Sequence, residues 1–583
     1  MDNRRWGLPL ALGALLGLCA LAFFSQLGGL GLLDKTEGLF VEVPRQMLLS
    51  GDWITPRWNG EPFFDYPVWG YWMVALSFRL FGVSVWAARL PVALAASATV
   101  FALFALVLLL APADEPQQRR LGRALLCATV LCLSPGWIGW GRTSVTDMFL
   151  ASAIGLAMIG FALAHGATDR PWLRRLGRAC LALFTAVAVL AKGPVGLLLP
   201  LVVIGLFLLL KGRPLRPLPL GVWLPMAGLL LAVVLPWYAL VTAANGSSFL
   251  VRFLGTSNLQ RFTAVIYNHP GPPWFYLPWL LLLLLPWSVY LPLALARLRF
   301  WRLSRWRRPQ PPGSDLALLA ALWLLVVVVF FSAAATKLPG YILPALPAAA
   351  LLVGLLFVPL PGPGPAPADR GAGWGWRCSG WCNALLLALG ALAAAAAPRW
   401  LPQDPAAPGF VGGLAASGAG WWLALPLLAA SVLLVRLLRR GDATALGHLW
   451  WPNAAGLALA LALLLPVLVP LIDRERLVPT RQLAGQAARL ARPREPLLVA
   501  GYRRYSVVFY ARRPVQFVGS AREAWQRLRA AAAAPPDSVL LLGSDSDLLE
   551  FGIGPGDGQP LQRLDAHRLL RLPWRELQRL AQG

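Results

Sequence analysis

A few isolated charged side chains stand at the ends of long apolar runs, and their types suit chemistry at a membrane surface. Asp34 and Glu37 follow the first apolar run, and Asp147 begins a later one in GRTSVTDMFL. Basic side chains occupy similar places: Arg142, Lys192, Arg252, Arg261, His269 and Lys337. Ionisable groups at membrane depth cost roughly 2.5–3.5 kcal/mol each, so they persist where they are paired, hydrated or functional.

This set of residues favours chemistry on a lipid phosphate. Lysine and arginine can hold a phosphate or diphosphate leaving group, and a carboxylate can take the proton of an acceptor hydroxyl. The substrate should therefore place its head group where the membrane ends, as a sugar carried on polyprenyl phosphate does. No nucleotide-binding loop is recognisable in the sequence, which agrees with a donor already attached to lipid. The residues predict glycosyl transfer from such a donor.

Each of these residues also has a purely structural interpretation. Asp147 could cap its helix, Lys192 and Lys337 could anchor spans at the interface, and His269 could be an ordinary interfacial residue. Glu42 and Arg45 fit an i,i+3 pair on an amphipathic interfacial helix. The functional interpretation rests on sidedness, because every isolated charge near a span end falls on the same predicted side of the membrane.

Membrane helices and the loops between them are expected to carry these residues. Of the 583 residues, 58% are hydrophobic and 13% are charged, which is more apolar surface than a soluble domain could bury. About thirteen runs reach membrane length. They are 8–33, 84–111, 121–140, 145–165, 179–191, 194–211, 219–243, 274–296, 315–333, 338–360, 383–397, 418–438 and 449–472. The aromatic segment 66–81 is shorter and is predicted to lie in the interface.

Arginine-rich clusters occupy alternate loops and predict the topology. The positive-inside rule makes their side cytoplasmic: MDNRR, QQRRLGR, DRPWLRRLGR, KGRPLR, RLRFWRLSRWRR, RGAGWGWR and RLLRRG. The net charge of +26 is therefore a sign of membrane topology and not of nucleic-acid binding. The loops 34–83 and 244–273 and the tail 473–583 are predicted to lie outside. Lysine is rare, which draws attention to the few present: Lys35, Lys192, Lys211 and Lys337.

Residues 473–583 differ in character from the transmembrane part, residues 1–472. EPLLVAGYRRYSVVFYARRPVQFVG and DSVLLLGSDSDLLEF favour short strands with turns, whereas SAREAWQRLRAAAA and WRELQRLAQ favour helices. A small extracytoplasmic α/β domain is predicted here. The six cysteines lie in or beside apolar runs, and their spacing fits neither a metal site nor a disulfide framework.

Six stretches between residues 34 and 347 resemble motifs of a known family, and they occur in the same order as in that family. They are DKTEGLFVEVPRQMLLSGDWITPRWNGEPFFDYP, FGVSVWAARLP, RTSVTDMFL, AKGPVGLLLP, SNLQRFTAVIYNHPGPPWFYLPW and TKLPGYILPALP. The chain is similar to integral-membrane GT-C glycosyltransferases of the aminoarabinose-transferase (lipid A modifying) and protein O-mannosyltransferase type. The resemblance implies a polyprenyl-phosphate sugar donor and an all-α polytopic fold followed by the small α/β tail.

The resemblance also implies roles for individual residues. It places the catalytic base on Glu37 or Asp34 and a second acid on Asp147. Other residues would surround the donor: Lys192, Arg261, Lys337 and Tyr341 near the phosphate, His269 and Arg252 nearby, and Asp65 and Tyr66 in the sugar or acceptor pocket. Tyr66 replaces a lysine common in the family, and Asn258 replaces a frequent acidic residue. No cofactor is expected, and Asn258 weighs against a metal ion at this loop, while the sequence leaves dependence on a divalent metal open.

The expected partners are the lipid-linked donor, membrane lipids, and an acceptor that is a glycolipid, a polysaccharide or a protein. Nucleic acid is not expected, and the chain should be a monomer. The expected location is a bacterial cytoplasmic (inner) membrane, with the N-terminus in the cytoplasm and the tail in the periplasm. The alternative function is a transporter or flippase for a lipid-linked or anionic solute. Transporters often show internal repeats and midplane charges, and this sequence shows neither clearly.

Overall fold

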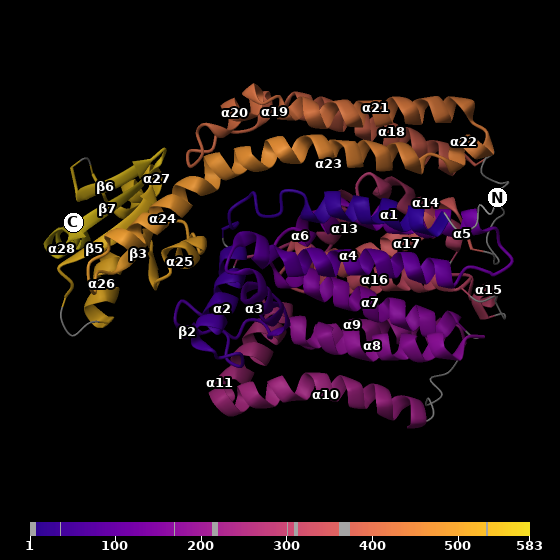
Figure 1. The fold of residues 1–583 in the computed structure, drawn as a ribbon, viewed down its shortest axis with the longest axis horizontal. Coiled ribbons are helices and arrows are strands. Elements are labelled where there is room, and N and C mark those ends of the chain that lie inside the picture. The colour runs from indigo at the N-terminus through magenta and orange to yellow at the C-terminus, as the bar shows by residue number, and fades with distance from the viewer. Residues whose placement is uncertain are drawn as a thin grey trace.

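The molecule is elongated, with long helices lying side by side and a small sheet domain beyond one end of them (Figure 1). The computed structural model describes residues 7–34, 36–167, 169–212, 220–266, 268–299, 301–307, 313–360, 373–531, 535–554 and 556–582. Lys35 lies outside these residues. The arrangement confirms the predicted polytopic helical chain with a C-terminal α/β domain.

Within the described residues, nine helices are long and apolar enough to cross a membrane, or eleven if two bent helix pairs each count as one span. The nine unbroken helices are α1 with η1 (Gly7–Phe24), α4 (Val85–Leu109), α7 (Thr146–Gly166), α10 (Leu220–Asn245), α16 (Leu316–Ala333), η4 with α17 (Pro339–Phe357), α18 (Trp374–Ala395), α21 (Ala419–Arg440) and α23 with its continuation (Trp450–Leu490). The bent pairs are α5 (Gln117–Cys132) with α6 (Pro135–Gly141), and α13 (Tyr276–Leu283) with Trp287–Leu298.

The two remaining predicted spans are also helical. They fall on α8 (Pro171–Lys192) and α9 (Val195–Leu210), which have 22 and 16 residues. The first predicted span was too long, because its helix ends at Phe24 and the chain then turns. Backbone groups in a bilayer must be satisfied within the segment, which is why apolar runs of this length become helices.

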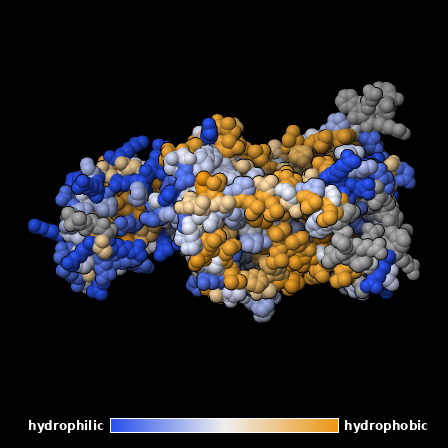
Figure 2. Space-filling view, turned by 90° about the horizontal axis from the view of Figure 1, so that it is seen from below, coloured by the Kyte–Doolittle hydropathy of each residue, from blue (hydrophilic) through white to orange (hydrophobic). Residues whose placement is uncertain are grey.

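Small residues let the central helices approach closely. On α7 and α8, a Cβ added at Gly177 would lie 2.5 Å from the carbonyl oxygen of Gly160. The outward faces are apolar, and Leu220 on α10 and Leu392 on α18 are among the large exposed side chains. Figure 2 shows this apolar surface over the helices and a hydrophilic surface over the tail domain. A membrane is the environment that covers such a surface.

The loop after the first span folds into a compact layer at the end of the helices nearest the tail (Figure 1). It contains α2 (Glu37–Ser50), a hairpin of β1 (Arg57–Trp58) and β2 (Glu61–Pro62), and α3 (Trp69–Phe81). The predicted pair on α2 is confirmed, since Arg45 Nε donates to Glu42 Oε2 at 2.7 Å. Both side chains are buried, so α2 is a packed element of this layer.

A second connection at the same end follows α10. It consists of α11 (Ser247–Leu250), the π-helical segment η2 (Val251–Gln260) and the short turn α12 (Arg261–Thr263). Aromatic packing fixes it to the first loop, because the Phe64 and Phe249 rings meet edge-on at 5.4 Å. The two connections thus form one layer above the helices.

The last span runs without a break into the tail. After α23 (Trp450–Ile472), the helix continues through η6 (Asp473–Leu477) and α24 (Val478–Leu490). The tail sheet has the strand order β4-β3-β5-β7-β6. Strands β3 (Leu497–Ala500), β4 (Val515–Val518) and β5 (Ser538–Ser544) are parallel, while β7 (His567–Pro573) pairs antiparallel with β5 and with β6 (Gln559–Leu564).

Part of the predicted tail structure was wrong. The two predicted helices are confirmed as α26 (Ala521–Ala531) and α28 (Trp574–Gln582). Residues 506–511 and 545–551 were predicted as strand or turn, but they form the helices α25 and α27. The hairpin of β6 and β7 was missed. Short apolar segments such as SVVFYA are compatible with either a helix or a strand. Here the segment is a helix that packs against α2.

Candidate functional site

A cavity of about 390 Å³ lies where the two connecting loops meet the ends of α8, α9 and α16. Five residues predicted from the sequence line it: Asp65, Tyr66, Lys192, Arg261 and Tyr341. They come from segments nearly 280 positions apart, since Asp65 precedes α3 and Tyr341 lies in η4 (Pro339–Ala345). The predicted donor residues therefore converge on one cavity.

Cationic and phenolic groups form one side of this cavity. Arg261 Nη1 donates to the Tyr66 hydroxyl at 3.0 Å. The Lys192 ammonium lies 4.5 Å from the ring centroid of Tyr341 and 5.8 Å from that of Tyr66. The Tyr341 hydroxyl is buried and finds no hydrogen-bond partner within the described part of the chain. These groups can receive an anionic ligand, because a buried hydroxyl without a partner is costly unless a ligand or water supplies one.

Two carboxylates accompany the cations. Asp65 lines the cavity, accepts a hydrogen bond from Ser257 Oγ at 3.3 Å, and lies 3.6 Å from Arg252 Nε. Asp147 lies in the first turn of α7 and forms an ion pair with Lys192. The structure therefore brings Asp147 to the edge of the site through Lys192, and it does not act only as a helix cap.

Most of the remaining residues in the cavity wall are apolar. Their side chains come from α9, η2, α12 and α16: Val195, Leu198, Leu254, Leu259, Phe262, Phe330 and Phe331. The sequence did not single these residues out, because apolar residues in membrane segments are the norm. Ser257 and Thr336 also line the cavity and were missed. An apolar wall beside a cationic patch suits a ligand that has an anionic head and a hydrocarbon chain.

Glu37, one of the two predicted bases, is not at this cavity. It is completely buried, and Arg89 donates to both of its carboxylate oxygens, from Nε at 2.7 Å and from Nη2 at 2.6 Å. The backbone amides of Leu33 and Ser144 donate to it as well, at 3.0 and 2.9 Å. Glu37 is thus held in a buried ion pair whose acceptor positions are filled.

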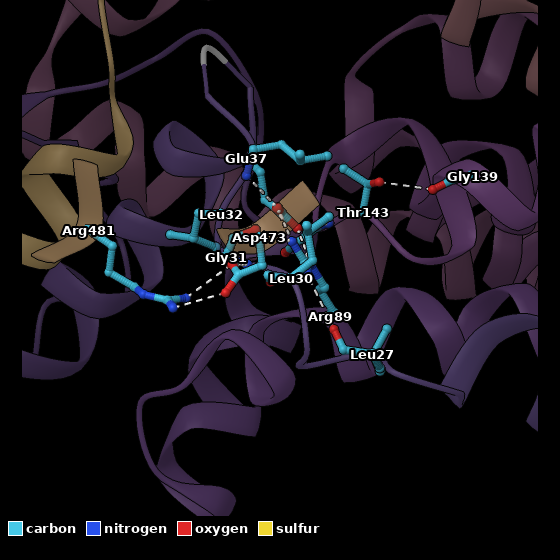
Figure 3. Close-up of polar contacts among 12 residues, drawn as sticks. Leu27, Leu30, Gly31, Leu32, Glu37, Arg89, Gly139, Thr143, Asp473 and Arg481 are labelled. Carbon is cyan, nitrogen blue, oxygen red and sulfur yellow. Dashed lines mark hydrogen bonds and ion pairs between the residues drawn. The ribbon is translucent and has the colours of Figure 1, made fainter. Parts of the chain in front are cut away.

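Arg89 is the centre of a cluster that fixes the end of the first span (Figure 3). It also donates to the carbonyl oxygens of Leu27, Leu30 and Gly31 at 2.7 to 3.0 Å. Asp473, at the start of η6, accepts from the Gly31 amide at 2.7 Å. Arg89 was not predicted as a functional or structural residue. Its position as an isolated arginine near the start of a predicted span could have indicated it.

Asp34, the other predicted base, faces the tail domain. Its Oδ1 accepts from the Ser506 amide at 3.0 Å. Burial raises the pKa of the Asp34 carboxyl above its usual range, although the hydrogen bonds from Ser506 and the charge of Arg504 oppose that shift. Asp34 therefore lies between the first loop and the tail, and not on the wall of the cavity.

Lys337 and His269 lie beside the cavity without lining it. The Lys337 ammonium donates to the carbonyl oxygens of Ser332 and Ala334, and its backbone amide donates to the His269 carbonyl at 3.0 Å. The His269 side chain is exposed. In the described residues, no group of three or more His, Cys, Asp or Glu side chains is placed to hold a metal ion.

Comparison with known families matches two parts of the chain. Residues 33–251 match the dolichyl-phosphate-mannose-protein mannosyltransferase family, and residues 490–583 match the C-terminal domain of cyanobacterial RgtA-type glycosyltransferases. The first match contains α2 and the residues Asp65, Asp147 and Lys192. The second covers the sheet domain.

Similar curated proteins are undecaprenyl phosphate-alpha-4-amino-4-deoxy-L-arabinose arabinosyl transferases. The chain is 31% identical over 356 residues to the one numbered 2 from Pseudomonas fluorescens, which is 60% of each chain. It is 34% identical over 347 residues to the one numbered 1 from Sodalis glossinidius, which is 60% of this chain and 59% of that relative. The matched region thus spans about 60% of the length of these relatives.

The fold is also that of a solved structure. ArnT from Cupriavidus metallidurans bound to undecaprenyl phosphate superposes with a TM-score of 0.74, at 23% identity, over 96% of this chain and 97% of that one. The apo state of the same protein gives a TM-score of 0.73. At this level of identity the likeness shows the fold, including the small sheet domain after the last span.

Proposed function

We propose that the chain transfers a sugar from polyprenyl phosphate to an acceptor hydroxyl or phosphate. Its similarity to the aminoarabinose transferases and the protein mannosyltransferases, and its shared fold with ArnT, support this proposal. The observation that carries the proposal is the cavity in which Lys192, Arg261 and the buried Tyr341 hydroxyl meet an apolar wall. The names of the relatives support undecaprenyl phosphate as the lipid carrier.

The reaction breaks one bond and forms another at the anomeric carbon. The bond between this carbon and the phosphate oxygen breaks, and its electron pair leaves with the polyprenyl phosphate. The acceptor oxygen bonds to the same carbon. A hydroxyl acceptor loses its proton to a carboxylate in this step, whereas an ionised phosphate acceptor has no proton to lose. The departing phosphate gains charge in the transition state, so fixed cations around it lower the barrier.

Several residues in and beside the cavity have proposed roles in this step. Lys192, Arg261 and the Tyr341 hydroxyl hold the phosphate, and the apolar wall receives the first part of the lipid chain. Asp65 takes the acceptor proton, because it lies on the cavity wall itself. Asp147 orients Lys192 through their ion pair. This assignment moves the base from Asp34 or Glu37 to Asp65.

The proposed setting follows the distribution of basic loops. The layer that carries the cavity and the tail domain would lie outside a bacterial cytoplasmic membrane, where a lipid-linked sugar meets periplasmic acceptors. A glycolipid, a polysaccharide or a protein could then be glycosylated. In this division, residues 1–472 provide the reaction site and residues 473–583 form a periplasmic domain.

The test uses the purified full-length protein in lipid nanodiscs with polyprenyl-phosphate sugars that differ in the sugar. Mass spectrometry would follow free polyprenyl phosphate after addition of an envelope glycolipid or polysaccharide extract. We expect release that depends on the acceptor and is lost in Lys192→Ala. A transporter or flippase would move the lipid-linked sugar without cleaving it. Binding of the donors without release of free polyprenyl phosphate from any of them would therefore overturn the proposal.

A further inference from the structure

The short hairpin of β1 and β2 joins the tail domain to the cavity. Its two strands pair antiparallel around a two-residue turn, Asn59-Gly60. Both turn residues have positive φ, 55° for Asn59 and 89° for Gly60. Asn-Gly is a favoured pair for such a turn, because asparagine and glycine tolerate the left-handed conformation. The sequence at this position therefore builds a tight and defined hairpin.

The tip of the hairpin is bound to the tail sheet. Asn59 Nδ2 donates to the Val515 carbonyl oxygen at 2.8 Å, and Asn59 Oδ1 accepts from the Val515 amide at 2.9 Å. Val515 begins β4, which is an edge strand of the sheet. The amide side chain thus takes the place of a neighbouring strand. Trp58 reinforces the contact, because its ring stacks on Phe517 with centroids 6.0 Å apart.

The other end of the hairpin reaches the cavity within a few residues. Phe63 and Phe64 are buried, and the Phe63 amide donates to the Pro56 carbonyl at 2.8 Å. The next two residues are Asp65 and Tyr66, which belong to the polar side of the cavity. Tyr66 stands only seven positions after Asn59. A restraint on the hairpin tip is therefore a restraint on Tyr66.

We infer that Asn59 is a positioning residue through which the tail domain holds Asp65 and Tyr66 in place. The two hydrogen bonds fix the tip, and the buried phenylalanines transmit that position to the cavity. The choice of ligand in the test rests on the proposed function, whereas the mechanical link between tail and cavity does not. The tail domain would then act on the cavity without lining it.

The test variant is Asn59→Asp in the full-length protein. Aspartate also suits the turn, but its carboxylate cannot donate to the Val515 carbonyl oxygen and places an oxygen against it. The matched control is Glu61→Gln, at an exposed residue of the same hairpin. Hydrogen exchange would be measured across residues 62–68, together with binding of undecaprenyl phosphate. Size-exclusion profiles would establish that each variant is folded.

In Asn59→Asp we expect faster exchange at residues 62–68 and weaker lipid-phosphate binding. The loss of one neutral hydrogen bond corresponds to about a two- to tenfold change in an equilibrium constant. Glu61→Gln should behave as wild type. In a Tyr66→Phe background, Asn59→Asp should weaken binding less, because Asn59 acts partly through the Tyr66 hydroxyl.

Two results would overturn the inference. One is unchanged exchange at residues 62–68 in Asn59→Asp, and the other is a binding defect that adds fully to that of Tyr66→Phe. Failure of the proposed function is a separate result, since the wild-type protein would then not bind undecaprenyl phosphate. The exchange measurement would still show in that case whether the tail restrains the cavity wall.

Discussion

At the scale of single residues, the carboxylates predicted from the sequence have different partners. Their substitution should therefore have different effects on activity and stability. Asp65 lies on the cavity wall, Asp147 pairs with Lys192, and Glu37 pairs with Arg89 away from the cavity. A carboxylate that takes a proton affects the chemical step, whereas one that orients a phosphate ligand affects donor binding. Kinetic constants can separate these roles.

The first prediction compares Asp65→Asn with Asp147→Asn. Loss of a general base typically lowers the rate by about 10²–10⁴-fold, so Asp65→Asn should reduce kcat strongly and leave donor binding intact. Asp147→Asn releases Lys192 and should raise KM for the lipid donor. Steady-state kinetics with a fixed acceptor would measure both effects. Near wild-type kcat in Asp65→Asn would exclude it as the base.

The second prediction concerns Glu37. Removing one partner of a buried ion pair leaves the other charge unpaired, which costs about 3–5 kcal/mol. Glu37→Gln should therefore lower the thermal stability of the protein, and any loss of transfer should follow the loss of folded protein. Thermal unfolding and specific activity per folded molecule would be measured together. A fully stable but inactive Glu37→Gln would return the catalytic role to Glu37.

At the scale of elements, close contact between α7 and α8 holds Asp147 and Lys192 together. Gly160 and Gly177 sit where the two backbones meet, so added side-chain atoms must push the helices apart. Asp147 and Lys192 lie at the other end of the same two helices. We therefore expect a change in helix spacing to disturb this ion pair.

The third prediction is that Gly177→Val lowers the unfolding temperature and weakens donor binding. Overpacking typically costs about 1–3 kcal/mol, and here the obstructing atoms are backbone and cannot move aside. Gly205→Ala on α9 is the control, because a Cβ at that position meets no atom within 4 Å. Thermal unfolding in detergent would compare the two. Equal stability of both variants would contradict the close-packing argument.

The fourth prediction concerns pH and the tail sheet. Burial, with the charge of Arg504, lowers the pKa of His567 on β7 to about 4. The folded state thus favours neutral histidine, and its contribution to stability should be lost as pH falls from the ordinary value of about 6.5 toward 4. Hydrogen-exchange protection of β5 would fall over this range. The decline should be smaller in His567→Gln, and an identical decline would refute the assignment.

At the scale of the whole molecule, the layer formed by the two connections lies at the same end of the helices as the tail (Figure 1), and the cavity lies where this layer meets the helices. Figure 1 shows α2, α3 and α11 at the end of the helices where the tail lies. If the basic loops are cytoplasmic, the whole layer is periplasmic. The orientation can be tested at positions whose exposure the structure provides.

The fifth prediction is that cysteines at Ser247 and Glu550 are labelled by an impermeant reagent in intact spheroplasts. Both residues are exposed, one at the start of α11 and one in the tail helix α27 (Asp545–Phe551). The native Cys19, Cys127 and Cys132 are buried and should react little, while Cys382 must be replaced because it is exposed. Labelling only after lysis would place the cavity in the cytoplasm.

Local sequence patterns were enough to predict the membrane helices and five residues that line the cavity. Apolar runs must become helices in a membrane, because the bilayer offers no other partner for backbone amides and carbonyls. Isolated lysines, arginines and tyrosines within distinctive motifs could also be recognised. Four of them line the same cavity: Lys192, Arg261, Tyr66 and Tyr341. Both inferences depend on local composition and on motif positions, which a sequence displays directly.

The partners of the carboxylates, in contrast, depend on tertiary packing. Asp34 and Glu37 are three positions apart, yet one accepts from Ser506 in the tail and the other pairs with Arg89 on α4. Their environments come from segments that lie far away along the chain, so no local pattern specifies them. For the same reason, the hydrogen bonds between Asn59 and Val515 could not be predicted from the sequence. A side chain's type can be read from the sequence, but its partners are set by how distant segments pack.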